Sequence, residues 1–145
     1  MNCYIEPLSI DNIDGVYEVE LSAFSHPWSK QAFLDELANP HARYFVLKSG
    51  DDVIGYAGLW HIIDEGHITN IAIKKEFQGK GLSLILMGKL IEYKNENSLL
   101  FLTLEVRESN IPARSLYEKY NFKEVGRRKN YYENKETAVL YSLEG

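Results

Sequence analysis

Apolar residues along the chain repeat with two periods, one typical of strands and one typical of helices. Residues 4–8 predict a first strand, after which a helix is expected to begin near Asp11. The buried stripe of this helix would consist of Ile13, Val16, Tyr17, Leu21 and Phe24. Ser29 is a favourable N-cap for a second, short helix, which ends at Asn39-Pro40 and carries Phe33, Leu34 and Leu37.

The middle of the chain predicts three strands and one long helix. Residues 43–48 and 53–62 indicate two strands that form a hairpin through 49–52. Residues 66–73 form the next strand, in which Ile68, Asn70 and Ala72 alternate with His67, Thr69, Ile71 and Ile73. The helical period then begins at Leu82 and continues to about residues 95–98. Its buried stripe is predicted to contain Leu82, Ile85, Leu86, Leu90 and Tyr93.

The last third of the chain predicts a strand at 99–106 that follows a helical crossover and therefore runs parallel to the strand at 66–73. One face of this strand carries Leu100, Leu102, Leu104 and Val106, and the other carries Phe101, Thr103, Glu105 and Arg107. Residues 109–112 cap another helix, which places Ala113, Leu116, Tyr117 and Tyr120 on one face and ends at a left-handed Asn121. Two strands, 122–125 and 137–143, close an α/β fold of the α+β type.

A loop with two glycines, Gln78-Gly79-Lys80-Gly81, lies where the strand period changes to the helix period. Glycines allow the backbone to approach a ligand closely, and a helix N-terminus favours phosphate. The loop is not a Walker A sequence, because it lacks the upstream glycine and the Lys-Ser/Thr pair. It fits a dinucleotide fingerprint poorly, since Leu84 occupies the third glycine position. The loop alone therefore leaves two interpretations, a turn before a helix or a site for an anionic cofactor.

Composition limits the classes of function. The 145 residues suit a single domain over 1–145, and the single cysteine, Cys3, excludes an internal disulfide and a zinc cluster. We expect no metal. No leader-like segment or run of about 20 apolar residues is present, which predicts a cytoplasmic protein without membrane contact. The net charge of −5 argues against direct nucleic-acid binding and suits a basic acceptor.

Four separate groups of residues resemble the RimI-type N-acetyltransferases of bacteria, within the GNAT superfamily. They are 26–29 (HPWS), 70–73 with 78–81 (NIAI and QGKG), 104–110 with 116–118 (LEVRESN and LYE), and 127–132 (RRKNYY). The sequence departs from the family pattern at Ser83, at Lys74-Lys75 and at Asn121. The resemblance implies a GNAT fold, with a mixed, mostly antiparallel sheet flanked by helices and a splayed parallel strand pair at the acetyl-CoA site. It also implies acetylation of the N-terminal alanine of small-subunit ribosomal protein eighteen.

The same resemblance implies roles for individual residues. The pantetheine arm of acetyl-CoA would lie along Ile71, Ala72 and Ile73, with a further contact from Asn110. The pyrophosphate would be held by Gly79, Lys80, Gly81, Leu82, Ser83 and Leu84. Glu105 would be the general base and Tyr117 the general acid, and the acceptor would be the N-terminal segment of a ribosomal protein.

The residue pattern by itself leaves these roles open. A carboxylate near a strand end is commonly solvated, and the helical spacing of Tyr117 also suits core packing. Pro27-Trp28 could equally be core packing or a wall of the acceptor site. Two other functions remain: a GNAT enzyme for another N-terminus or a small amine, and a non-catalytic acyl-CoA-binding module.

Overall fold

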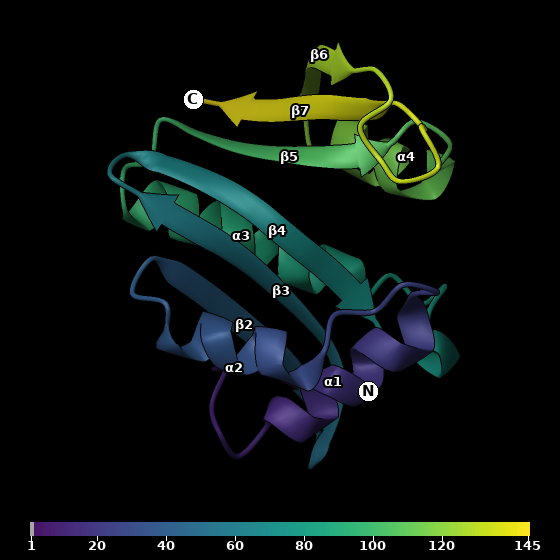
Figure 1. The fold of residues 1–145 in the computed structure, drawn as a ribbon. Helices are drawn as coiled ribbons and strands as arrows, with labels where there is room; N and C mark the ends of the chain where they lie inside the picture. The colour runs from purple at the N-terminus through teal and green to yellow at the C-terminus, as the bar shows by residue number, and fades with distance from the viewer. Residues whose placement is uncertain (1) are drawn as a thin grey trace.

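The computed structural model describes residues 2–145, which fold around a seven-stranded mixed sheet (Figure 1). The strand order is β1-β2-β3-β4-β5-β7-β6, and β4 and β5 form the parallel pair among otherwise antiparallel neighbours. The mixed, mostly antiparallel sheet predicted from the sequence is thus confirmed. The strands are β1 (Cys3–Pro7), β2 (Ala42–Ser49), β3 (Asp52–Ile62), β4 (Glu65–Ile73), β5 (Phe101–Arg107), β6 (Lys123–Arg128) and β7 (Ala138–Glu144).

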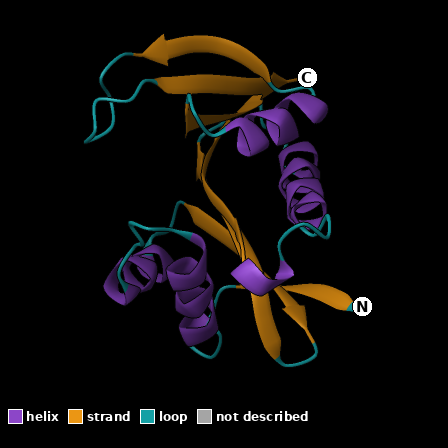
Figure 2. Cartoon of the chain, turned by 90° about the vertical axis from the view of Figure 1, so that its right-hand side faces the viewer, coloured by secondary structure: helices purple, strands orange, loops and turns teal. Residues whose placement is uncertain are grey.

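Helices cover both faces of the sheet: α1 (Ile13–Ala23), α2 (Lys30–Ala38), α3 (Ser83–Glu96) and α4 (Ile111–Lys119), with a short 3₁₀ turn, η1 (Lys75–Phe77). Figures 1 and 2 show α1 and α2 on one side of β2–β4 and α3 on the other. Ser29 caps α2, as predicted, by accepting the Ala32 N–H at 3.1 Å. None of the helices in the described part of the chain has the length and apolar character needed to cross a bilayer.

Each face of the sheet carries its own apolar layer. The layer beneath α3 is built by β3, β4, β5 and β7 and includes Leu59, Leu86, Leu90, Leu102 and Tyr141. The layer beneath α1 and α2 includes Ile13, Val16, Phe33, Tyr44 and Tyr56. Burial of these side chains is the main favourable contribution to folding.

The buried faces of two helices differ from the sequence prediction. In α1 the stripe is correct for Ile13 and Val16, but Leu21 and Phe24 are exposed. The helix ends at Ala23, so Phe24 belongs to the following loop, and Val19 and Glu20 are buried instead. In α3 the buried face is rotated toward Met87, which leaves Ile85 exposed. Leu100 is likewise exposed, because it precedes β5 and does not share its inner face.

The strict alternation predicted for β4 is also wrong, because a β-bulge interrupts the strand. Gly58 of β3 pairs with Asn70, while Leu59 pairs with Ile68, so Thr69 is the extra residue. The side chains of Thr69 and Asn70 therefore both face α1 and α2. There Thr69 Oγ1 shares a hydrogen bond of 2.7 Å with the Tyr44 hydroxyl, and Asn70 Nδ2 donates to the Tyr56 hydroxyl at 2.7 Å.

Candidate active site

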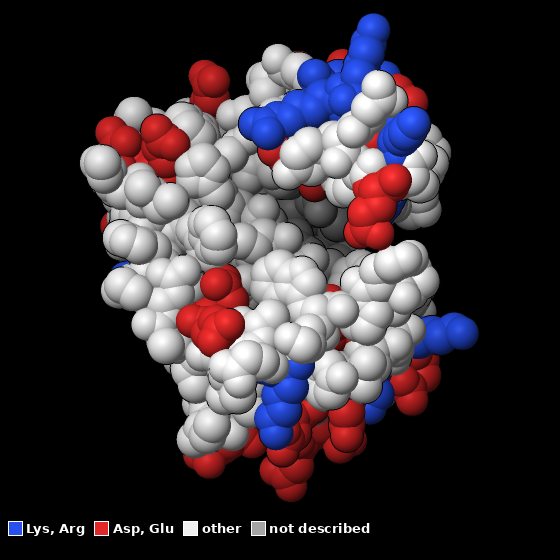
Figure 3. Space-filling model, in the orientation of Figure 1, with Lys and Arg blue, Asp and Glu red and all other residues white. Residues whose placement is uncertain are grey.

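A cavity opens where the parallel strands β4 and β5 separate. The two strands pair only over residues 65–67 and 101–103, and beyond these residues a space of about 520 Å³ lies between them. Figure 3 shows the surface hollowed on the side toward which both strands run. Side chains from α1, the loop after α1, the β4 bulge, β5 and α4 surround the cavity.

Glu105 and Tyr117 both line this cavity, from β5 and α4 respectively. Glu105 points away from the buried layer formed by Leu102 and Leu104, as the alternation predicted, and Arg128 Nη2 lies 3.7 Å from its Oε1. A carboxylate acceptor and a phenol donor thus open onto one space.

The environment of Tyr117 combines packing with a free hydroxyl. Its ring lies 5.8 Å from that of Phe122 and 6.1 Å from that of Tyr141. Burial, and to a smaller degree the charge of Tyr132, raise the pKa of Tyr117 to about 12. Among residues 2–145 its hydroxyl has no hydrogen-bond partner. The phenol therefore keeps its proton at neutral pH and is available to a ligand.

The glycine loop forms a second cavity of about 480 Å³ at the start of α3. Gly79 and Gly81 have φ values of +79° and +74°, in the left-handed region that glycine adopts most readily. Gln78 Nε2 donates to the Ile73 carbonyl at 2.9 Å and holds the loop at the end of β4. Within the described residues, the backbone N–H groups of 79–83 donate to no protein acceptor. Free amides at a helix N-terminus form an anion-binding surface.

The two cavities are adjacent, and Ile71, Asn110 and Ala113 line both. Asn110 also caps α4, accepting the Ala113 N–H at 3.3 Å. Most residues expected at the cofactor site line the second cavity: Ile71, Ile73, Gly79, Gly81, Leu82, Ser83 and Asn110.

The other three residues expected at this site lie differently. The Ala72 side chain packs in the layer beneath α1 and α2. Lys80 reaches outward, with its Nζ 5.5 Å from the centre of the Phe77 ring. Leu84 is not part of the cavity lining. Ala72 and Leu84 could therefore offer a ligand only their backbone groups.

Three side chains of the first cavity were not recognised from the sequence as site residues. Glu20 is 1% exposed and accepts hydrogen bonds from the Tyr56 hydroxyl and the Trp28 N–H. The sequence signal for Glu20 was its place among the apolar positions of α1, where a charged residue is unexpected. Arg107 and Tyr132 stack, with the guanidinium carbon 4.0 Å from the ring centre. That contact joins β5 to the loop after β6, and sequence spacing gives no sign of it.

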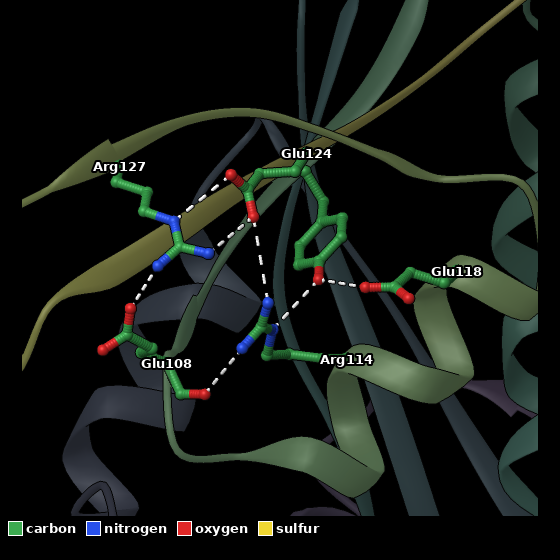
Figure 4. A network of polar contacts seen from close by, with 6 residues as sticks. Glu108, Arg114, Glu118, Glu124 and Arg127 are labelled. Atoms are coloured by element: carbon green, nitrogen blue, oxygen red, sulfur yellow. Dashed lines mark hydrogen bonds and ion pairs between the residues drawn. The ribbon is translucent and has the colours of Figure 1, made fainter.

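Helix α4, which carries Tyr117 and is capped by Asn110, is fixed by a polar network (Figure 4). Arg114 donates to the Glu108 carbonyl at 2.9 Å and to the Tyr141 hydroxyl at 3.1 Å, and this hydroxyl donates to Glu118 at 2.6 Å. Arg127 binds both Glu108 and Glu124. These contacts hold α4 against β6 and β7. Nowhere in residues 2–145 do three or more His, Cys, Asp or Glu side chains form a group that could hold a metal ion.

Comparison with known proteins adds independent information. The family model described as Acetyltransferase (GNAT) family matches residues 13–122. A Haemophilus influenzae protein named [ribosomal protein bS18]-alanine N-acetyltransferase is 41% identical over 130 residues, 88% of this chain and 86% of that protein. A Bacillus subtilis protein that carries the same name provisionally is 42% identical over 138 residues, 94% of this chain and 91% of the relative. The crystal structure of the ribosomal-protein-S18-alanine N-acetyltransferase from Escherichia coli superposes with a TM-score of 0.92 at 29% identity, covering 99% of this chain and 94% of that one.

Proposed function

Because this chain belongs to the GNAT acetyltransferase family, we propose that it transfers the acetyl group of acetyl-CoA to the N-terminal alanine of ribosomal protein bS18. The observation that carries this proposal is that the cavity at the glycine loop adjoins the cavity of Glu105 and Tyr117, with three residues lining both. With its pyrophosphate on the loop, acetyl-CoA could extend its thioester into a cavity that holds both a base and an acid. An acceptor of this kind suggests that the enzyme works in the cytoplasm.

The proposed cofactor site uses mainly backbone groups. The free amides of 79–83 and the positive end of α3 would bind the pyrophosphate of acetyl-CoA. The pantetheine arm would follow residues 71–73 of β4 toward Asn110, beyond the point where β5 stops pairing. Ser83 takes the place of the usual Gly or Ala. It lies at the first position of α3, where a small side chain leaves the neighbouring amides accessible.

Glu105 is proposed to prepare the acceptor amine. An α-amine has a pKa of about 7.7–8.0, so roughly a tenth of it is neutral at pH 7. The Glu105 carboxylate can take the remaining proton, directly or through one water. The amine lone pair then attacks the thioester carbonyl carbon. Because a thioester is already reactive, no nucleophilic side chain is needed.

Tyr117 is proposed to assist the leaving group. As the new C–N bond forms, the C–S bond breaks and its electron pair remains on the CoA sulfur. The Tyr117 hydroxyl can donate its proton or a hydrogen bond to this thiolate, since its raised pKa keeps it protonated. The nitrogen loses its second proton to water as the amide forms, and the Tyr117 hydroxyl regains its own proton from solvent. An ammonium group and a thioester thus give an amide, the CoA thiol and one released proton.

The proposal is tested with purified protein, acetyl-CoA and a peptide that copies the N-terminus of bS18. CoA release should require the peptide, and mass spectrometry should find one acetyl group on its α-amine. The matched control is the same peptide with its N-terminus already blocked. Binding of acetyl-CoA without CoA release, for this peptide and for a panel of other amines, would show a non-catalytic module instead. Turnover only with other amines would reassign the acceptor.

A further inference from the structure

We propose that Glu20 is a positioning residue for the acceptor, because it links two walls of the first cavity. One wall is the loop at 24–29, between α1 and α2, and the other is the bulge of β4. The identity of the acceptor in this inference rests on the proposed function. The contacts of Glu20 that support the inference are features of the structure and do not depend on which acceptor is used.

Glu20 is held by hydrogen bonds rather than by a counter-charge. Its side chain is buried, and a buried carboxylate is tolerated only when its oxygens are bound. Oε1 accepts from the Tyr56 hydroxyl at 2.5 Å, and Oε2 accepts from the Trp28 N–H at 2.9 Å. In the described part of the chain, no Lys, Arg or His lies within ion-pair distance of it. The charge therefore depends on two donors from separate elements, β3 and the 24–29 loop.

The direction of each hydrogen bond in this network is fixed. Asn70 Nδ2 donates to the Tyr56 oxygen at 2.7 Å, so the hydroxyl proton of Tyr56 must point to Glu20. Burial, and next the charge of Glu20, raise the pKa of Tyr56 far above its usual value, so this proton stays in place. Both oxygens of Glu20 consequently face donors. A carboxylate satisfies both donors, whereas the amide of Gln has only one acceptor oxygen.

Aromatic packing holds the same loop from its other side. The Trp28 ring lies 5.5 Å from Phe33, whose ring meets Tyr56 edge-on at 5.4 Å. Loss of the second acceptor on residue 20 should therefore release the Trp28 backbone while the ring stays packed. The expected result is a displaced cavity wall in a folded protein. The glycine loop lies on the α3 side and should be unaffected.

The test compares Glu20→Gln and Tyr56→Phe with Ser22→Ala. Ser22 is also on α1 and accepts the Lys75 N–H at 3.1 Å, but it does not line the cavity, so it is the matched control. We expect both network variants to raise KM for the alanine peptide roughly tenfold or more. The turnover number at saturating peptide and the Kd of acetyl-CoA should stay within about twofold. Ser22→Ala should match the wild type in all three.

A second measurement does not require the acceptor to be known. Hydrogen exchange followed by NMR should show the Trp28 amide protected in the wild type and exposed in Glu20→Gln. Unchanged protection, an unchanged KM, or a parallel loss of acetyl-CoA affinity and turnover would each overturn the inference. If Glu20→Gln does not fold, Tyr56→Phe is judged by KM, turnover and acetyl-CoA affinity alone, because Trp28 keeps its acceptor in that variant. A wild type that acetylates no alanine peptide would refute the proposed function. The hydrogen-exchange protection of the Trp28 amide would then be the one measurement that tests whether Glu20 positions the 24–29 loop.

Discussion

Replacing Gly81 with Asp or with Asn separates the effect of charge from the effect of shape in the glycine loop. Gly81 has a φ of +74°, where an L residue costs about 1 kcal/mol, and Asp and Asn are among those that tolerate it best. A Cβ added here would meet only Leu84 Cδ1, at 3.7 Å, which is ordinary contact. Both variants should therefore fold, with a similar loss of about 1 kcal/mol in the free energy of unfolding.

The difference between the two variants comes from one negative charge. If the pyrophosphate lies on the loop amides, a carboxylate at Gly81 would stand about 5 Å from a phosphate. Two unit charges at that distance repel by about 3 kcal/mol when the effective dielectric constant is about 20. Solvent in the open cavity reduces this repulsion to about 1–2 kcal/mol. Acetyl-CoA should thus bind about 5- to 30-fold more weakly to Gly81→Asp than to Gly81→Asn.

Calorimetric titration with acetyl-CoA measures this difference, and thermal unfolding verifies that both variants are folded. Steric crowding by the new side chain should weaken binding in both, so that binding to Gly81→Asp falls close to the detection limit. Added salt should narrow the gap between them. A folded Gly81→Asp protein with wild-type affinity would show that the pyrophosphate binds elsewhere. Equal losses in both variants would refute the charge argument.

Four further predictions concern the chemistry. Glu105→Gln should lower turnover by roughly 10²–10⁴-fold with acetyl-CoA affinity retained, and high pH should partly restore the rate because more amine is neutral; an unaltered pH–rate profile would contradict the role of base. Tyr117→Phe should also slow turnover, without recovery at high pH, and wild-type turnover would return this residue to a packing role. A peptide with an N-terminal alanine and an internal lysine should be acetylated at the α-amine, since lysine carries a handicap of roughly 3 kcal/mol in its neutral fraction at pH 7; fragment masses showing mainly acetyl-lysine would overturn this. The pKa of Tyr117 is raised to about 12 in the folded protein, so the folded state favours the protonated phenol. The resulting stabilisation is complete below pH 10 and falls by about 3 kcal/mol as the pH rises toward 12. The free energy of unfolding of Tyr117→Phe, measured with denaturant, should therefore depend less on pH across this window than that of the wild type.

Local signals allowed the elements to be predicted from the sequence. Ser29 and Asn110 are caps whose hydrogen bonds lie within three residues, and the hairpin at 49–52 and the left-handed Asn121 depend on adjacent residues. The alternation on β5 also placed Glu105 correctly, because that strand pairs with β7 without a shift in register. Hydrogen bonds between neighbouring residues and an uninterrupted strand alternation were therefore sufficient to predict these caps, turns and the orientation of Glu105.

Sequence reasoning failed where distant residues decide the structure. The bulge at Thr69 depends on the pairing of β4 with β3, and nothing within residues 66–73 reveals it. Glu20 occupies a core position because Tyr56, 36 residues away, supplies a donor. The helical period predicts a buried Phe24, but α1 ends at Ala23. The cavity itself results from the separation of β4 and β5, which no local pattern encodes.

The short seam between β4 and β5 also has a mechanical consequence. β1 is one edge of the sheet and β7 lies beyond the seam, so a force applied to these two strands acts across all the strand pairs between them. In the described residues β4 and β5 pair only over 65–67 and 101–103, beside one hydrogen bond from the Leu100 N–H to the Asp64 carbonyl at 2.8 Å. Under tension the molecule should divide there first, into a lobe with α1 and α2 and a lobe with α4. A ligand that contacts both lobes would hold them together, so the force needed to separate the lobes should increase with the fraction of protein that has ligand bound.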